Sequence, residues 1–422
     1  MSFATWKIWL KTLPLAMKWL VLLILFRPLI DVFYFLKEIS PVISPLYIVG
    51  VLSPVFILLS LLSKGLPIKF KSIVSDFNFW VWGGLSLFNI VLILFIDFSL
   101  DTFGDVLKYI TPILLFIYFR RFINSKRQLN GVLTTFLISA IVPAIILTYE
   151  LIFGPISTQE LSANRGGGLR YQGGYADVMN YAIYATGSLL IQAYFFIQAG
   201  RKKKRRVFRL LFVFIYATAT LIAIKQTASW GVLLAIVFLF FIFNLGSRKG
   251  FLVLLVSMPL LVFLGTRVYN KTVEPLIERE IQVIEGDADV DRSFNGRMSR
   301  WKKYFQVWEE MPIYSNLFGV ITSDQEEART MVGGGMHSDY VRMLFLTGII
   351  GLLFYLLFLV YLIRKSFRMT SPERFLTIAA ITCLLMYSVS TCPLTYSFFT
   401  YLIFPIMAYA SLPKYILKKE ND

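Results

Sequence analysis

The sequence is poor in charge, in cysteine and in histidine. Only 16% of its 422 residues are Asp, Glu, Lys or Arg, whereas a soluble globular protein carries roughly 25%. This shortage excludes a soluble enzyme and a disordered chain. The two cysteines, Cys383 and Cys392, are too few for a disulfide framework or a thiolate cluster, and we interpret both as packing residues.

His337 is the only histidine of the chain, which excludes a metal site built from His and Cys ligands. It is also the obvious candidate for a base that titrates near neutral pH. The acidic stretch 287–293 does not form a calcium loop, because an EF-hand needs Gly at its sixth position and Glu at its twelfth. Those positions hold Arg292 and Met298, so no metal and no cofactor is expected.

Hydrophobic residues are abundant, at 57% of the chain, and they form long runs separated by short basic clusters. The net charge of +17 would suggest a nucleic-acid partner only if the basic residues formed one patch. They do not, so a nucleic-acid-binding module is excluded. The sequence predicts an all-α, polytopic membrane protein.

About 20 apolar residues are needed for a helix to cross the hydrocarbon core of a bilayer. Twelve segments meet this test, and the chain is therefore predicted to be a single membrane domain, residues 1–422. The segments are 14–36, 45–63, 74–96, 106–123, 130–153, 177–199, 207–224, 229–246, 250–267, 338–363, 374–390 and 395–412. In the first of them Arg27 and Asp31 stand four residues apart, which predicts either an ion pair or a polar cavity wall.

The basic clusters lie in alternate loops, which predicts a multi-pass membrane protein with both termini in the cytoplasm. Two segments on the opposite side are longer than simple turns. They are a first outer loop, 154–176, and a large outer loop, 268–337, between the ninth and tenth spans. In the large loop, aromatic residues recur from Trp301 to Trp308 with the spacing of an amphipathic helix, whose aromatic face suits either the membrane interface or the ends of the spans.

The first outer loop combines glycines with two arginines, Arg165 and Arg170. Glycine allows close approach of the backbone to a ligand, and the guanidinium group suits bidentate binding of phosphate oxygens. The segment is either an anion site or a flexible loop that faces lipid headgroups. Lys225, at the tip of the turn between the seventh and eighth spans, either helps to hold an anionic ligand or extends toward the headgroups.

The large outer loop adds Arg297 and Arg300, and it ends at His337, which precedes the tenth span. Ser338 or Asp339 is a candidate for the N-cap of that span. His337 should then lie at the outer mouth of the helix bundle. A structural role and a role as a catalytic base are both open at this point.

These motifs resemble the bacterial O-antigen polymerase/ligase superfamily, integral-membrane glycosyltransferases of the GT-C type. Arg170-x-x-Gly173 is similar to the first-loop pattern of the superfamily, and Asn295-Gly-Arg297 with Phe318-Gly319 is similar to the second. His337-Ser-x-Tyr340, followed by Gly348 and Gly351, resembles the terminal motif. Where many members have Ser-Arg, this chain has Ser229-Trp230, which leaves Lys225 as the candidate substitute.

The resemblance implies transfer of a glycan from an undecaprenyl-pyrophosphate carrier to a sugar hydroxyl, on the outer face of the bacterial cytoplasmic (inner) membrane and without metal or nucleotide sugar. Arg170 and Arg297, helped by Arg165, Arg300, Lys225 and Tyr340, would bind the pyrophosphate and the substrate, and His337 would deprotonate the acceptor or orient it. The implied partners are the lipid-linked donor and acceptor oligosaccharides, membrane lipids and a chain-length regulator. The His-Ser-x-Tyr ending favours a surface-polysaccharide polymerase. An O-antigen ligase and a lipid-linked glycan flippase are the alternatives, although no repeat typical of a transporter is seen.

Overall fold

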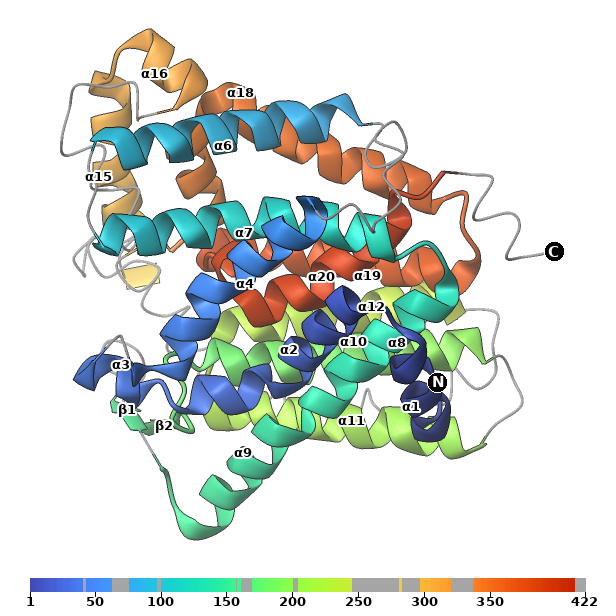
Figure 1. Cartoon of the computed structure of the whole chain (residues 1–422). Coiled ribbons are helices and arrows are strands. Elements are labelled where there is room, and N and C mark those ends of the chain that lie inside the picture. The colour runs from blue at the N-terminus through green and yellow to red at the C-terminus, as the bar shows by residue number, and fades with distance from the viewer. Residues whose placement is uncertain are drawn as a thin grey trace. The chain divides into compact units, whose positions relative to one another are not determined.

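The computed structural model describes residues 1–40, 43–62, 76–96, 100–156, 158–160, 169–199, 204–244, 281–282, 297–319 and 337–413. These residues are almost all helical (Figure 1). They divide into two compact units, one of residues 1–139, 307–370 and 387–422, and one of residues 140–306 and 371–386. The two units are described separately.

Unit 1 contains most of the N-terminal helices and the C-terminal ones. Its elements are α1 (Phe3–Thr12), α2 (Leu15–Val32), α3 (Phe35–Ile39), α4 (Pro45–Leu62), α6 (Phe77–Ile96), α7 (Leu100–Phe122), α8 (Lys126–Ser139), α16 (Ile313–Phe318), α18 (Asp339–Ser366), the 3₁₀ turn η7 (Pro393–Thr395) and α20 (Ser397–Ala410). It also holds the last turn of α15 and residues 387–390 of α19.

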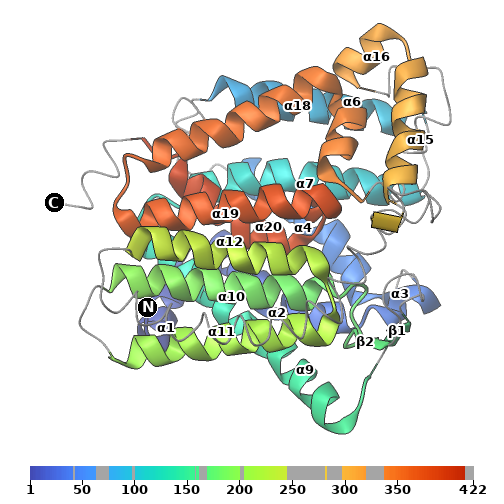
Figure 2. The same ribbon diagram turned by 180° about the vertical axis from the view of Figure 1, so that it is seen from behind.

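Unit 2 holds α9 (Ile141–Phe153), a short hairpin of β1 (Thr158–Glu160) and β2 (Leu169–Tyr171), α10 (Met179–Gln198), α11 (Lys204–Ile224) and α12 (Thr227–Asn244). The first three turns of α15 (Arg297–Glu310) and most of α19 (Ser371–Ser390) also belong to it. Figure 2 shows α10 beside α11, against which it packs. Helix α10 is buried almost all round, as expected of an apolar helix at the centre of a bundle.

The core of unit 1 is aromatic. Phe79 and Trp82 of α6 contact Phe358 of α18, and Phe79 also contacts Phe116 of α7. These rings fix the pairing of α6 with α18 and α7 that Figure 1 shows. Arg27 and Asp31 form a buried ion pair at 2.8 Å, which confirms the pairing that their spacing predicts.

Helical structure is present at eleven of the twelve predicted spans, and the twelfth, 250–267, lies outside the described residues. Within the described part of the chain, six helices are long and apolar enough to cross a membrane, namely 45–62, 77–96, 126–153, 206–224, 339–366 and 371–390. Two shorter apolar helices are 228–244 and 397–410. Large apolar side chains such as Leu15 and Phe153 are more than two-thirds exposed on the surface, where lipid would cover them. The prediction of an all-α polytopic membrane protein is confirmed.

Within these spans the structure adds breaks that hydropathy did not predict. The fifth span is divided at Ala140 into α8 and α9, and α18 contains a residue, Gly348, with non-helical angles (φ 65°, ψ −174°). The predicted amphipathic helix is confirmed as α15, although Arg297 and the two following residues are described in their backbone only. The acidic stretch 287–293 lies outside the described residues.

Candidate active site

His337 lies in unit 1, directly before the first turn of α18, and its side chain is exposed. Its backbone has a left-handed conformation, with φ of 48°. Such a conformation costs a residue other than glycine about 1 kcal/mol, although histidine adopts it more readily than most residues do. The surrounding structure must therefore hold this turn in place.

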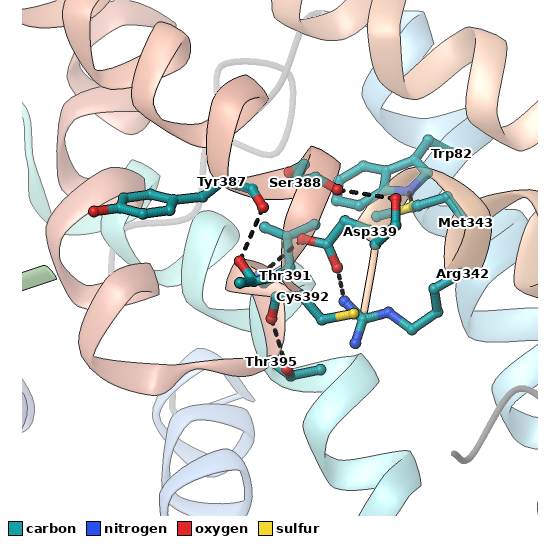
Figure 3. A network of polar contacts seen from close by, with 11 residues as sticks. Trp82, Asp339, Arg342, Met343, Tyr387, Ser388, Thr391, Cys392 and Thr395 are labelled. Carbon is teal, nitrogen blue, oxygen red and sulfur yellow. Dashed lines mark hydrogen bonds and ion pairs between the residues drawn. The ribbon is translucent and has the colours of Figure 1, made fainter. Parts of the chain in front are cut away.

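The residues after His337 are anchored to the last turn of α19 and to the segment that joins α19 to α20 (Figure 3). The Ser338 hydroxyl donates to the Ser388 carbonyl at 3.0 Å, and the Asp339 N–H donates to the Thr391 carbonyl at 3.2 Å. The Asp339 carboxylate accepts the Leu394 N–H at 3.0 Å and forms an ion pair with Arg342. We call Ser338, Asp339 and Arg342, with these partners, the anchor of His337.

The anchor corrects one detail of the sequence analysis. Ser338 does occupy the N-cap position of α18, but its hydroxyl makes no capping bond, because it donates to Ser388. Asp339 is the first residue of the helix and is fully buried. A buried carboxylate is stable only when hydrogen bonds and opposite charge compensate it, and here Leu394 and Arg342 supply both. Tyr340, which the sequence suggested as a substrate contact, is partly buried on the next position of the helix.

The first helical segment of α18 ends at Gly348, where the chain passes close to α16. A side chain at Gly348 would collide with the Leu317 carbonyl. Gly319 also has positive φ, of 122°, and approaches the Leu346 carbonyl, while the Asn89 amide of α6 donates to the Phe318 carbonyl at 2.8 Å. The glycines of the Phe318-Gly319 and Gly348 motifs thus allow α16 to pack on the bend of α18.

Unit 2 carries the cationic residues that the sequence singled out. Arg170 lies at the centre of β2, opposite Gln159 of β1, and its side chain is partly buried. Strand β2 contacts α11, the helix after which Lys225 adopts a left-handed conformation with φ of 50°. Arg300 is exposed on α15. Arg165 and the side chain of Arg297 lie outside the described part of the chain.

Glu150, near the end of α9, organises the first outer loop. Its carboxylate is fully buried and accepts the N–H of Ile156 at 3.1 Å, the N–H of Gly173 at 3.0 Å and the hydroxyl of Tyr181 at 2.8 Å. Gly173 has φ of 65°, and a side chain there would collide with the Tyr181 hydroxyl. The Arg170-x-x-Gly173 motif therefore contains a glycine for which no other residue can be substituted without displacing Tyr181.

The sequence analysis missed Glu150, Arg342 and the contribution of Asp339 beyond capping. A signal for each was present, because Glu150 is the one charged residue within 130–153, and Asp339 and Arg342 stand three residues apart at the start of an apolar run. Ionisable residues in a membrane span are rare and tend to pair or to face a functional cavity.

Among the described residues, no three His, Cys, Asp or Glu side chains are placed to hold a metal ion.

The family comparison matches part of this chain. Residues 211–356 match the family model described as O-antigen ligase. The matched segment begins in α11 and includes Lys225, α15, His337 and the bend of α18. Comparison with curated proteins gives no match.

The match bears on the general function. It supports a membrane enzyme of surface-polysaccharide biosynthesis and does not separate polymerase from ligase. Residues 211–356 are thus similar to the superfamily that the motifs of the chain resemble.

Proposed function

We propose that the protein is a surface-polysaccharide polymerase that transfers a growing glycan from an undecaprenyl-pyrophosphate carrier to a sugar hydroxyl of a lipid-linked acceptor. The reaction would take place on the outer face of the cytoplasmic membrane, with both termini of the protein in the cytoplasm. The observation that carries the proposal is the position of His337, the single histidine of the chain, exposed beside an anchored helix start within the matched segment.

The chemistry requires a base and fixed positive charge. A neutral imidazole at His337 would take the proton from the acceptor hydroxyl as that oxygen attacks the anomeric carbon. The bond to the pyrophosphate oxygen breaks, and charge develops on the lipid pyrophosphate. Arg170 and Arg297, helped by Arg165, Arg300 and Lys225, would stabilise this charge, since guanidinium groups bind phosphate oxygens in a bidentate manner. Attack opposite the leaving group inverts the anomeric centre.

Tyr340 lies in the first turn of α18, three residues after His337, and would contact the acceptor that His337 activates. The proposed partners are the lipid-linked donor and acceptor, membrane lipids and a protein that regulates chain length. An O-antigen ligase is the second candidate function, since the family model that matches residues 211–356 is that of O-antigen ligase. The ligase would use the same groups on a different acceptor, lipid A core or a protein.

Deletion of the gene, followed by electrophoresis of the surface glycan, separates these functions. A polymerase predicts loss of long chains while single repeat units remain on the acceptor. Full-length polymer that accumulates on its lipid carrier would contradict the polymerase and support the ligase. Loss of single repeat units as well as long chains, with lipid-linked units retained in the cytoplasmic leaflet, would contradict both and support a flippase.

Complementation with Arg170→Lys tests the pyrophosphate assignment. We expect severe loss of long chains, because an ammonium group is a point charge and does not replace the planar fork of arginine. The matched control is Arg127→Lys on the exposed surface of α8, which should complement fully. Normal chain length in Arg170→Lys would mean that this residue supplies positive potential alone.

A further inference from the structure

Helix α1 is too short to cross a membrane and does not continue the span that follows it. Its ten residues, Phe3–Thr12, extend over about 15 Å, which is half the thickness of the hydrocarbon core. Leu13 and Pro14, both with extended backbone angles, separate it from α2. Because the predicted topology places this end of α2 in the cytoplasm, we expect α1 to lie at the cytoplasmic surface of the membrane.

Two tryptophans hold one face of α1 against α8. Trp6 and Trp9 are only 5% and 2% exposed. The Trp6 indole N–H donates to the Thr135 hydroxyl at 2.9 Å, and the Trp9 ring lies so close to Gly131 that a side chain there would collide with it. Figure 1 shows α1 beside α8, in agreement with these contacts. The two rings fix the rotation of α1 about its axis and so determine which face remains exposed.

The opposite face of α1 is both apolar and cationic. Phe3 and Ile8 are 56% and 61% exposed, and the side chains of Lys7 and Lys11 are exposed beside them. The Lys7 ammonium lies 4.9 Å from the centre of the Phe3 ring. Neither lysine forms an ion pair within the described residues, and the first 30 residues of the chain contain no Asp or Glu. This face therefore presents net positive charge next to apolar surface.

A face of this composition matches the boundary between lipid headgroups and acyl chains. A short amphipathic helix lies in the plane of that boundary, with its apolar side chains in the acyl region and its lysines among the headgroups. The long methylene chain of lysine lets the ammonium group reach the phosphates while its stem stays in the apolar layer. Since a zwitterionic headgroup has no net charge, only an anionic headgroup is attracted by the lysines, and each of them strengthens binding about fivefold.

We propose that the exposed face of α1 binds the phosphate headgroups of anionic membrane lipids, in the leaflet that faces the cytoplasm in the predicted orientation. Lys7 and Lys11 contact the phosphates, and Phe3 and Ile8 enter the adjoining acyl region. This site does not depend on the proposed function, because α1 carries none of the residues assigned to the reaction.

A fluorescence titration of the full chain in detergent tests the lipid specificity of this face. Cys383 and Cys392 are replaced by alanine, and Ile8→Cys carries an environment-sensitive dye. Dioctanoyl phosphatidylglycerol, the anionic probe, should bind at least tenfold more tightly than zwitterionic dioctanoyl phosphatidylcholine. The double variant Lys7→Gln/Lys11→Gln should bind the anionic lipid about 25-fold more weakly. Its affinity for the zwitterionic lipid and its melting temperature should not change, because Trp6 and Trp9 still dock the helix.

A second double variant, Arg364→Gln/Arg368→Gln, controls for net charge. It removes the same charge from exposed positions near the end of α18, on the same predicted side of the membrane, and should leave the titration of the Ile8 dye unchanged. An equal loss of affinity in both double variants would overturn the proposal, because net charge and not α1 would then attract the lipid. Equal affinities of the parent protein for the two lipids, or no effect of Lys7→Gln/Lys11→Gln, would overturn it as well.

Photo-crosslinking in intact cells separates a lipid from a protein as the occupant of this face. With the photo-reactive residue benzoylphenylalanine in place of Ile8, we expect adducts with phospholipid that become fewer in Lys7→Gln/Lys11→Gln. A crosslink to an acidic protein, lost in the same variant, would overturn the lipid assignment.

Discussion

His337 combines an exposed imidazole with a backbone conformation that few residues adopt. A substitution that removes the imidazole can therefore also strain the turn. An alanine variant alone would not separate the loss of the base from the strain of the backbone. Asparagine tolerates the left-handed region better than other residues, and glycine adopts it without strain. These two residues allow the chemical role of the imidazole to be tested apart from the conformation.

We expect His337→Asn and His337→Gly to insert normally and to keep the wild-type melting temperature within about 2 °C, because a surface substitution changes stability by less than about 0.5 kcal/mol. Both should lose long-chain glycan, since loss of a general base lowers the rate by roughly 10²- to 10⁴-fold. The measurement is glycan electrophoresis after complementation, with thermal unfolding of the purified variants. Normal polymer in either variant would exclude His337 as the base.

Glu150 is a second residue whose role follows from its hydrogen bonds. Replacement by alanine leaves the N–H groups of Ile156 and Gly173 and the Tyr181 hydroxyl without their common acceptor. Each buried donor that loses its acceptor costs about 1–3 kcal/mol, so the loop that carries Arg170 should open. We expect faster hydrogen–deuterium exchange at the Gly173 amide in Glu150→Ala and a smaller increase in Tyr181→Phe, which removes one donor. Equal exchange rates at the Gly173 amide in the wild type and in Glu150→Ala would show that the backbone alone determines the conformation of the loop.

At the scale of the elements, α18 determines where the anchor of His337 lies. The helix changes direction at Gly348, and its first segment is tied to the joint between α19 and α20 by Ser338 and Asp339. Helix α16 packs against the bend through Leu317 and Gly319. A change at Gly348 therefore reaches His337 although the two residues are eleven positions apart.

Gly348→Ala should destabilise the protein, because alanine has no easy access to φ of 65° and its Cβ would collide with the Leu317 carbonyl. The expected cost is about 1–3 kcal/mol, measured as a lower melting temperature and accompanied by loss of long chains. Gly84→Ala in α6 is the matched control, since a Cβ there meets no atom within 4 Å and alanine favours the helix. If Gly348→Ala and Gly84→Ala have the same melting temperature, the bend at Gly348 is not required for stability.

The sequence predicted the helices well and their interruptions poorly. Apolar runs identify spans because lipid demands about 20 apolar residues in a row, and α6, α10 and α11 begin and end within a few residues of their predicted bounds. The bend at Gly348 depends on contact with α16, and the burial of Glu150 depends on donors 6, 23 and 31 residues further along the chain. Such contacts are long-range, and hydropathy contains no information about them. Among the site residues, His337 was predicted from its rarity, whereas the contacts of Asp339 with Thr391 and Leu394 form only in the folded unit.

At the scale of the whole molecule, the charge of the loops determines the predicted orientation. Arg120, Arg121, Lys126 and Arg127 surround the turn between α7 and α8, and loops rich in Lys and Arg stay on the cytoplasmic side. The Arg170 loop and His337 belong to segments that the same rule places outside. The proposed reaction requires this orientation, because its lipid-linked substrates are presented on the outer face.

Site-directed labelling of cysteines tests the orientation in intact cells. Cys383 and Cys392 are first replaced by alanine, which is a small change because one is buried and the other partly buried. In that background, Ile156→Cys, at an exposed position just after α9, should react with a thiol reagent that cannot cross the membrane. Asn124→Cys, exposed between α7 and α8, should react only after the cells are permeabilised. The opposite pattern would place Arg170 and His337 on the cytoplasmic side, where the proposed transfer could not reach substrates on the outer face.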